Sequence, residues 1–330
     1  MPDFDAIVWE WIVFSVLVVI LLALDLLVFH RHDHAPTLRE SAWWTVFWVG
    51  VGLTFNAAIW WWKGYETGVS FLSAFLIEKS LSMDNIFVFV VIFRFFAVPL
   101  MYQYRVLFWG ILGAIVMRLA FILAGVELIH RFDWVIPLFG VFLVYTAYRL
   151  ARHSGAEVHP ENNPVLLLAR RCLRITRGDH HQYGHAFFAR EAGLLCITPM
   201  FLTLLVIEST DVVFAVDSVP AVIGIIPKTF STSQAMFIAF SSNVFAILGL
   251  RALYFLLAGM VEQFRFLHYG LAAVLGFVGL KMLAEFGFHF EMRPAVSLLI
   301  VLALLVFSVI ASLLLKPPAD EAGADEAGKV

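Results

Sequence analysis

Residues 69–93 read VSFLSAFLIEKSLSMDNIFVFVVIF, an apolar run that Glu78, Lys79 and Asp84 interrupt at its centre. As a helix, this stretch is long enough to cross the hydrocarbon core of a bilayer, which takes about 20 residues. An ionisable residue at the centre of a membrane helix costs about 2.5–3.5 kcal/mol, so each one needs a partner, a water-filled cavity or a function. The stretch therefore predicts a membrane helix that contributes to a functional site.

The composition of the whole chain also points to a membrane. Of 330 residues, 62% are hydrophobic and 14% are charged, whereas soluble domains have about 45–50% and about 25%. The net charge of -3 does not suggest a nucleic-acid partner. Cys172 and Cys196 are the two cysteines and form no CxxC pair, so neither a disulfide framework nor a finger-type zinc site is indicated. We therefore expect the lipid bilayer to be the natural solvent of this chain.

Apolar segments of spanning length recur along the chain and predict an all-α, polytopic transmembrane bundle of about nine helices. The expected spans are residues 6–29, 42–62, 69–93, 106–129, 134–150, 194–223, 235–257, 267–286 and 294–315. The first of these follows Asp3 and Asp5 rather than a basic region, so we expect it to be a retained helix and not a signal peptide.

The distribution of Lys and Arg predicts the orientation and the domain organisation. An external amino terminus places most of these residues in cytoplasmic connections, which is the positive-inside arrangement, and leaves the carboxyl terminus in the cytoplasm. The predicted units are an amino-terminal helix pair, a first three-helix repeat, an Arg-rich cytoplasmic loop with a short amphipathic helix, a second three-helix repeat, a final helix and a disordered tail. They cover residues 1–68, 69–150, 151–193, 194–286, 287–316 and 317–330.

A weak internal repeat supports two inverted three-helix units. Residues 81–87, LSMDNIF, and residues 208–214, ESTDVVF, share Ser, Asp and Phe at the same offsets. Each segment is followed by a span with one central arginine, Arg118 or Arg251, and the two units enter the membrane in opposite directions. Inverted-repeat transporters have this pattern, with the substrate site near midplane where the units meet. Chance similarity between apolar helices is the alternative.

Carboxylates and amides gather in both halves of the expected repeat. The candidate metal ligands are Glu78, Asp84, Asn85, Glu208, Asp211, Asp217 and Asn243. Oxygen donors with no thiolate or intramembrane histidine nearby suit Mn²⁺, Mg²⁺ or Ca²⁺ better than copper or zinc. Protons bind the same carboxylate oxygens, so they would compete with the cation. We therefore expect a midplane cation site coupled to protons, and no prosthetic group.

The spacing of these acids leaves their convergence open. Glu208 and Asp211 are three residues apart, which puts both on one face of a helix. Glu78 and Asp84 are six residues apart, as are Asp211 and Asp217, and six residues turn a helix by about 240°. A regular helix would direct the members of each pair away from each other. Either the two helices unwind there, or some of the acids bind arginines.

Four further ionisable residues are candidates for counter-charges or proton coupling. They are Asp25, Lys79, Arg118 and Arg251. A structural role is the alternative, in which the two arginines pair with Asp84 and Asp211 and hold the bundle together. Two arginines and one lysine cannot neutralise five acids, which favours a functional site.

Longer motifs give a specific family resemblance. They are EKSLSMDNIF at 78–87, ESTD at 208–211, DSVPA at 217–221 and SNVFAILGLRALY at 242–254, with ALDL at 23–26 and FHR at 29–31. Together they strongly resemble the TerC/Alx family of integral membrane proteins, over roughly residues 6–315. Members are linked to manganese efflux, metal homeostasis, alkaline-pH response and, by name, tellurite resistance. The resemblance implies a bacterial inner-membrane exporter of Mn²⁺, related in design to LysE-like transporters built from three-helix repeats.

The sequence thus predicts a secondary transporter that exports divalent cations, with Mn²⁺ as substrate. The alternative is a non-transporting membrane assembly factor or tellurite-resistance factor, for which the Arg-rich loop would matter more than the buried acids. We do not expect an enzyme, because no GxGD, HExxH or membrane Ser-His pair is present. The chain also has no GxxxxGK[ST] loop, which argues against direct coupling to ATP.

Overall fold

The computed structural model describes residues 2–29, 37–152, 160–176, 183–184, 186–191, 193–258, 267–288 and 292–314. The side chains of a few helical residues inside these ranges, Asp84 among them, are not described. The predicted disordered tail lies outside the described residues.

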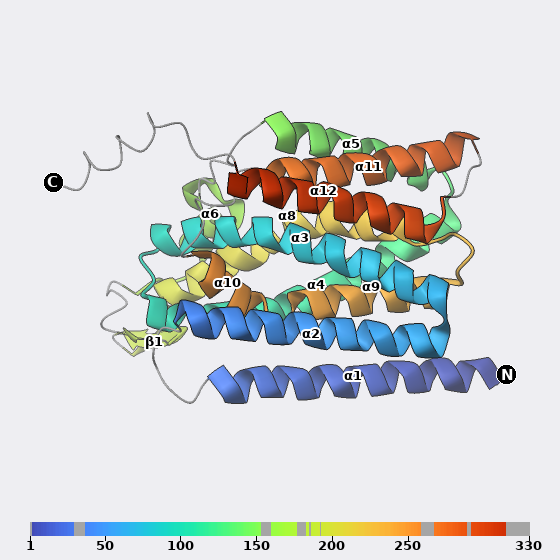
Figure 1. Ribbon diagram of the computed structural model, residues 1–330. Coiled ribbons are helices and arrows are strands. Elements are labelled where there is room, and N and C mark those ends of the chain that lie inside the picture. The colour runs from blue at the N-terminus through green and yellow to red at the C-terminus, as the bar shows by residue number, and fades with distance from the viewer. Residues whose placement is uncertain are drawn as a thin grey trace.

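The described chain is a bundle of long, roughly parallel or antiparallel helices (Figure 1). The helices are α1 (Pro2–Phe29), α2 (Leu38–Lys63), α3 (Tyr65–Phe95), α4 (Leu100–Arg131), α5 (Val135–Arg152), α6 (Pro164–Cys172), α8 (Pro199–Ile225), α9 (Thr232–Ile247), α10 (Leu250–Ala258), α11 (Leu267–Phe288) and α12 (Pro294–Leu314), with a 3-10 turn, η1 (Pro160–Asn162). A two-stranded antiparallel hairpin, β1 (Phe188–Glu191) and β2 (Leu194–Ile197), precedes α8. The all-α prediction is confirmed.

Among the described residues, seven helices are long and apolar enough to cross a membrane. They are α1, α2, α4, α5, α8, α11 and α12, and α9 and α10 meet the same conditions when they are taken together as a bent pair. The 31-residue α3 is long enough too, but its central charges lower its hydropathy. It lies among the spanning helices and packs on α2, α8, α9 and α12 (Figure 1). All nine predicted spans therefore have helical counterparts.

Two of the predicted spans need correction. Residues 194–197 are not the start of the sixth span, because they pair with Phe188–Glu191 as β2, and the helix begins at Pro199. The seventh span, 235–257, is not continuous, because α9 ends at Ile247 and α10 leaves it at an angle of 44°. Gly249 allows this break, since its φ of +79° is a conformation that side chains disfavour, and a Cβ there would lie 2.4 Å from the Trp48 Cβ.

The two predicted three-helix units make reciprocal contacts. The first helix of each unit packs on the second helix of the other, α3 on α9 and α8 on α4. The first helices also contact each other, and the third helices, α5 and α11, pack together. This exchange places α3, α4, α8 and α9 at the centre of the bundle. The division of the chain into domains at the predicted boundaries stays a prediction.

Candidate functional site

A polar belt separates two hydrophobic clusters along the central helices. We call the end of the bundle that carries α6 and the hairpin the α6 end, and the opposite end, which carries the amino terminus, the far end (Figure 1). On α3, residues 71–77 belong to the far-end cluster and residues 86–93 to the α6-end cluster. On α4, residue 114 belongs to the α6-end cluster and residue 122 to the far-end cluster; on α8, the same holds for residues 207 and 219. The charged residues Glu78, Lys79, Arg118, Glu208, Asp211 and Asp217 fall in these gaps, so the belt lies at mid-depth.

Arg118 of α4 is the centre of the belt and is 2% exposed. Its Nη1 lies 2.5 Å from Glu78 Oε2 on α3, while Nη2 and Nε donate to the two carboxylate oxygens of Asp211 on α8 at 3.3 and 3.4 Å. Nη1 also donates to Ser218 Oγ at 3.3 Å. One guanidinium therefore joins carboxylates from both three-helix units. Buried ion pairs of this kind depend on good geometry, because both ions lose their hydration.

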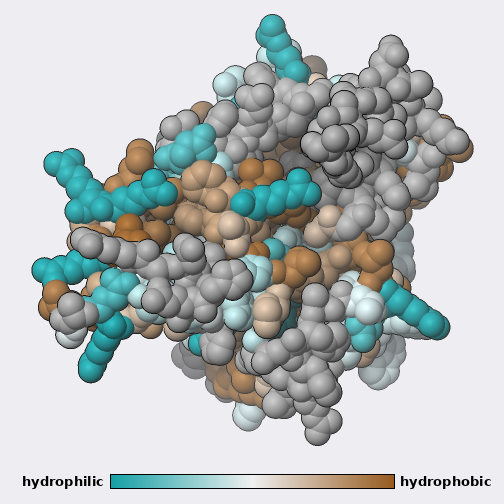
Figure 2. All heavy atoms as spheres, turned by 90° about the vertical axis from the view of Figure 1, so that its left-hand side faces the viewer, coloured by the Kyte–Doolittle hydropathy of each residue, from teal (hydrophilic) through white to brown (hydrophobic). Residues whose placement is uncertain are grey.

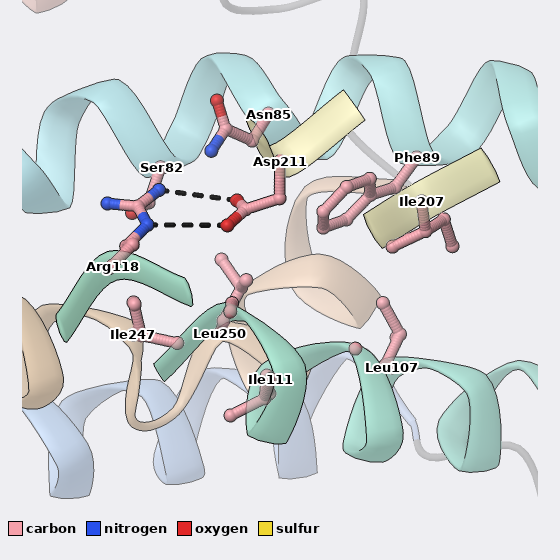
Figure 3. Close-up of a pocket in the computed structure, with 12 residues that line it drawn as sticks. Ser82, Asn85, Phe89, Leu107, Ile111, Arg118, Ile207, Asp211, Ile247 and Leu250 are labelled. Atoms are coloured by element: carbon pink, nitrogen blue, oxygen red, sulfur yellow. Dashed lines mark hydrogen bonds and ion pairs between the residues drawn. The ribbon is translucent and has the colours of Figure 1, made fainter. Parts of the chain in front are cut away.

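A small cavity adjoins this ion pair on its α6 side. It has a volume of about 10 Å³, which is room for about one water molecule. Figure 3 shows Arg118 and Asp211 facing each other at the cavity, with Ser82 and Asn85 of α3 beside them. Phe89, Leu107 and Ile207 are among the apolar side chains that close it toward the α6 end. The cavity thus combines polar groups at one end with an apolar wall at the other.

Two oxygen atoms of α3 in the belt are buried without a hydrogen-bond partner among the described residues. They are Glu78 Oε1 and Ser82 Oγ. Glu78, Ser82 and Asn85 are spaced four and three residues apart, so they lie on one face of α3. An unsatisfied buried polar atom costs about 1–3 kcal/mol. Such atoms in a native protein call for an explanation, such as a ligand or a bound ion.

Glu208 lies one helical turn before Asp211 on α8 and packs against α4. A Cβ at position 113 would lie 2.0 Å from Glu208 Oε1. Gly113 therefore leaves the space that this carboxylate occupies, because it has no side chain. Glu208 is half-buried and has no hydrogen bond or ion pair to any described residue. Its neighbour Ser209 accepts a hydrogen bond from Asn163 Nδ2 at 2.9 Å, and Asn163 is the cap of α6. The carboxylate thus sits between the belt and the α6 end.

The remaining predicted ligands occupy different positions. Asp217 accepts a hydrogen bond from Thr146 Oγ1 on α5 at 3.2 Å. Asn243 is fully buried in α9, and neither of its side-chain polar atoms has a partner among the described residues. The side chain of Asp84 lies outside the description. Of the predicted set, Asn85 and Asp211 line the cavity, and Glu78 joins them through Arg118.

The geometry decides between the two explanations of the six-residue spacing. Both α3 and α8 are continuous helices through the acidic motifs, so they do not unwind there. Instead Glu78 and Asp211 bind Arg118, while Asp217 points to α5. The backbone interruption occurs instead in the second unit after α8, between α9 and α10.

Lys79 is tied to that interruption rather than to a carboxylate in the described part. Its Nζ donates to the carbonyl of Ala246 at 3.1 Å. Because α9 ends at Ile247, this carbonyl has no partner further along the helix. A cation at a helix carboxyl terminus is also favoured by the helix dipole. Lys79 therefore stabilises the end of α9.

Arg251 forms a second buried ion pair, with an acid that the structural alternative did not include. The Asp25 carboxylate of α1 pairs with it, and Arg251 Nη2 also donates to the Asp25 backbone carbonyl at 2.8 Å. The guanidinium lies 5.6 Å from the centre of the Phe108 ring. This pair attaches α1 to α10. The other half of the alternative holds, since Asp211 does pair with Arg118.

Helical spacing could have identified residues that the sequence reasoning did not assign to the site. Ser82 lies four residues after Glu78, and Ser218 lies seven after Asp211, so both share a face with a site acid. Gly113 gives no such signal, because its role depends on α8 packing against it. Among the residues whose side chains are described, no three His, Cys, Asp or Glu gather in a metal-binding arrangement. The assignment of metal ligands stays a prediction.

The fold and the site define an integral, multi-pass membrane protein with a charged centre shared between two three-helix units. Residues 63–319 match the integral membrane protein TerC family, and the chain belongs to that family. The resemblance expected from the acidic motifs is confirmed. The match begins at Lys63, the end of α2.

Curated relatives extend the similarity to nearly the whole chain. An uncharacterized membrane protein of Myxococcus xanthus, STKORF319, is 45% identical over 316 residues, which cover 96% of this chain and 95% of that protein. A protein of Escherichia coli K12 with the provisional name membrane-bound redox modulator Alx is 43% identical over 309 residues, 91% of this chain and 92% of its own. An uncharacterized membrane protein of Rickettsia felis is 37% identical over 308 residues, 93% and 98% of the two chains. No solved structure is significantly similar to this chain.

Proposed function

We propose that the protein is a secondary transporter of divalent cations, with Mn²⁺ as its leading substrate, and that the polar belt around Arg118 is the substrate site. The observation that carries this proposal is the sharing of Arg118 by Glu78 and Asp211. Two acids from opposite units meet at one buried point, beside a cavity and unsatisfied oxygen atoms. A site of this kind between inverted units is where such transporters bind their substrates.

Arg118 occupies the position that a transported cation would take. A cation that enters the belt competes with the guanidinium for the oxygens of Glu78 and Asp211. When the cation leaves, the guanidinium returns and again pairs with both carboxylates, compensating part of their charge. This exchange avoids leaving two buried anions uncompensated, which would cost several kcal/mol.

The other oxygen donors of the belt would complete the shell of a hard cation. Asn85 supplies a carbonyl at the cavity, and Glu208 supplies a carboxylate one turn from Asp211. Carboxylate, amide and hydroxyl oxygens suit Mn²⁺, Mg²⁺ and Ca²⁺. We assign Asp84 and Asp217 to the same pathway as further ligands or proton carriers, and Asn243 as a further neutral ligand.

The surface charge of the α6 end supports the orientation that we propose. Hydrophilic side chains project around this end when it is viewed face-on (Figure 2). Exposed arginines at the helix ends and in the connections there are Arg39, Arg94, Arg149, Arg152, Arg170, Arg171 and Arg174. By the positive-inside rule, this charge supports a cytoplasmic α6 end and an external amino terminus. We infer a location in the bacterial inner membrane and export toward the far end.

The test is cation flux through the purified protein in liposomes. Mn²⁺, Mg²⁺, Ca²⁺ and Zn²⁺ are each supplied with and without an imposed pH gradient, and uptake is followed with an internal metal-sensitive dye. We expect Mn²⁺ flux that the pH gradient accelerates. Asp211→Asn should reduce this flux at least about tenfold, which corresponds to a loss of ~1.4 kcal/mol of interaction free energy at the site. A matched control is Glu127→Gln, because Glu127 pairs with Arg131 on the exposed surface.

Full Mn²⁺ flux in Asp211→Asn would overturn the site assignment, and no flux of any cation in the parent protein would overturn the transport function. The assembly-factor alternative is tested separately with Arg170→Gln and Arg171→Gln. Both side chains are exposed on α6, so this change alters the loop surface without disturbing buried contacts. We expect metal tolerance of cells to depend on Asp211 and not on these two arginines.

A further inference from the structure

A second cavity lies at the far end of the bundle. It has a volume of about 190 Å³ and lies between parts of α4, α5, α8, α9 and α11. Val126, Ile129 and Ile223 form part of its apolar wall, and Asp133, Lys228 and Glu285 supply charged groups. Asp133 and Lys228 are exposed, so the cavity reaches the protein surface. At ~30 Å³ per molecule, such a space holds several waters.

The cavity and the Arg118 site lie on the same helix face. On α4, Ile122, Val126 and Ile129 follow Arg118 at spacings of four, eight and eleven residues, which keeps them on one face. On α8, Ser218 and Val222 follow Asp211 at seven and eleven residues. A path along the contact of α4 and α8 therefore leads from the ion pair to the cavity.

A dry layer closes this path. Ile122, Val126, Val219 and Val222 are each at most 3% exposed and belong to the far-end cluster. Gly125 allows α4 to approach α8 closely here, since a Cβ at this position would lie 3.0 Å from Ile223 Cδ1. The layer places apolar side chains between the Arg118 site and the far-end cavity. In this conformation a hydrated ion cannot cross it.

Pro220 gives α8 a point at which this layer can move. It lies inside the helix, beside Val219. Proline has no N–H to donate to the carbonyl four residues earlier, so the helix is weakened at this turn. Gly125 on α4 and Pro220 on α8 lie at the same depth in the bundle.

We propose that this cavity is the second mouth of the pathway, a binding site for a hydrated divalent cation, and that Ile122, Val126, Val219 and Val222 are its gate. The inference rests on the proposed function, because it takes the Arg118 belt as the central site. Asp133 and Glu285 are the acids that face the mouth, with Lys228 beside them. Lys281, next to the cavity, is held by the Gly224 carbonyl at 2.9 Å and by Glu285 at 3.4 Å.

Thiol accessibility tests this inference. In a background with Cys172→Ser and Cys196→Ala, single cysteines replace Ile129 in the cavity wall, Ile122 in the gate and Leu128 as control. Leu128 neighbours Ile129 but is 40% exposed on the outer surface of α4. A charged, membrane-impermeant thiol reagent is then added to either side of oriented vesicles that contain the reconstituted protein.

We expect Ile129→Cys to react from the far-end side only, at least about tenfold faster than Leu128→Cys, since thiolates form in water and not in lipid. Ile122→Cys should react only while a Mn²⁺ gradient drives turnover. As a second measurement, Ile122→Ala combined with Val219→Ala should give a passive Mn²⁺ leak that needs no pH gradient.

The outcomes separate this inference from the function beneath it. Suppose that the parent protein transports Mn²⁺ but that Ile129→Cys reacts no faster than Leu128→Cys. This result would overturn the second mouth and leave the transport function intact. Absence of flux in the parent would overturn the transport function, and the inference with it. Constant labelling of Ile122→Cys without any cation would overturn the assignment of the gate.

Discussion

The two buried arginines, Arg118 and Arg251, differ in what surrounds them. Arg118 contacts two carboxylates on two helices from opposite units, together with a hydroxyl, and it borders a cavity. Arg251 pairs with the Asp25 carboxylate, donates to the backbone carbonyl of the same residue, and lies near the Phe108 ring. Both side chains are almost fully buried.

This difference separates a candidate binding site, at Arg118, from a structural ion pair between Asp25 and Arg251, which we call the clamp. The anions around Arg118 outnumber the guanidinium, and space lies beside them, so another cation can take its place. The Asp25–Arg251 pair joins the peripheral helix α1 to α10, and Arg251 is not among the residues that line the cavity. Burial of a charge is therefore not enough to mark function; the contact with both three-helix units and the adjoining cavity distinguish Arg118 from Arg251.

The largest expected effect is on stability, from breaking the clamp. Arg251→Leu removes one partner of the buried Asp25–Arg251 ion pair, a change that costs about 3–5 kcal/mol. Adding Asp25→Leu should recover most of this loss and leave Mn²⁺ flux near the parental level. Thermal unfolding in detergent and liposome flux measure the two effects. If the double variant were no more stable than Arg251→Leu, the clamp role would be wrong.

Removing a charge next to Arg118 should affect Mn²⁺ flux more than stability. Glu78→Gln keeps a polar group beside Arg118 but removes one charge, and we expect a loss of about 1.5–3 kcal/mol of stability together with most of the Mn²⁺ flux. Glu127→Gln, which breaks an exposed pair, should change stability by about 0–1 kcal/mol. Unchanged flux in Glu78→Gln would remove Glu78 from the site.

A smaller effect should follow from crowding Glu208 without changing any charge. Gly113→Ala places a methyl group within 2.0 Å of the present position of Glu208 Oε1, so the carboxylate must move. We expect Mn²⁺ flux to fall about tenfold, in line with the strong effect of small displacements in a preorganised site. Gly50→Ala, on α2, meets nothing within 4 Å and is the control. Equal flux in the two variants would exclude Glu208 from the pathway.

The smallest expected effect is at Lys79. Lys79→Met removes the cation that caps α9 through the Ala246 carbonyl, a contribution of about 0.3–1 kcal/mol that reaches ~2 kcal/mol in buried settings. Flux should be largely retained, because this cation does not contact the acids of the belt in the described structure. A loss of flux larger than that of Asp211→Asn would assign Lys79 to the pathway instead.

The sequence by itself determined the class of protein and the depth of the site. Apolar segments of spanning length require a bilayer, and the charges of 78–84 and 208–217 fall at mid-span because helical rise relates position in the sequence to depth. The helical faces of Glu78 and Asp211 also follow from spacing. These are local properties, since each depends on one helix alone.

The tertiary structure decided which charges meet. Arg118 and Arg251 look alike in the sequence, yet one joins α3 to α8 and the other joins α10 to α1. The break at Gly249, the space that Gly113 leaves for Glu208 and the far-end cavity likewise depend on neighbouring helices. Pairing across helices depends on their packing and rotation, and hydropathy and spacing within one helix carry no information about either.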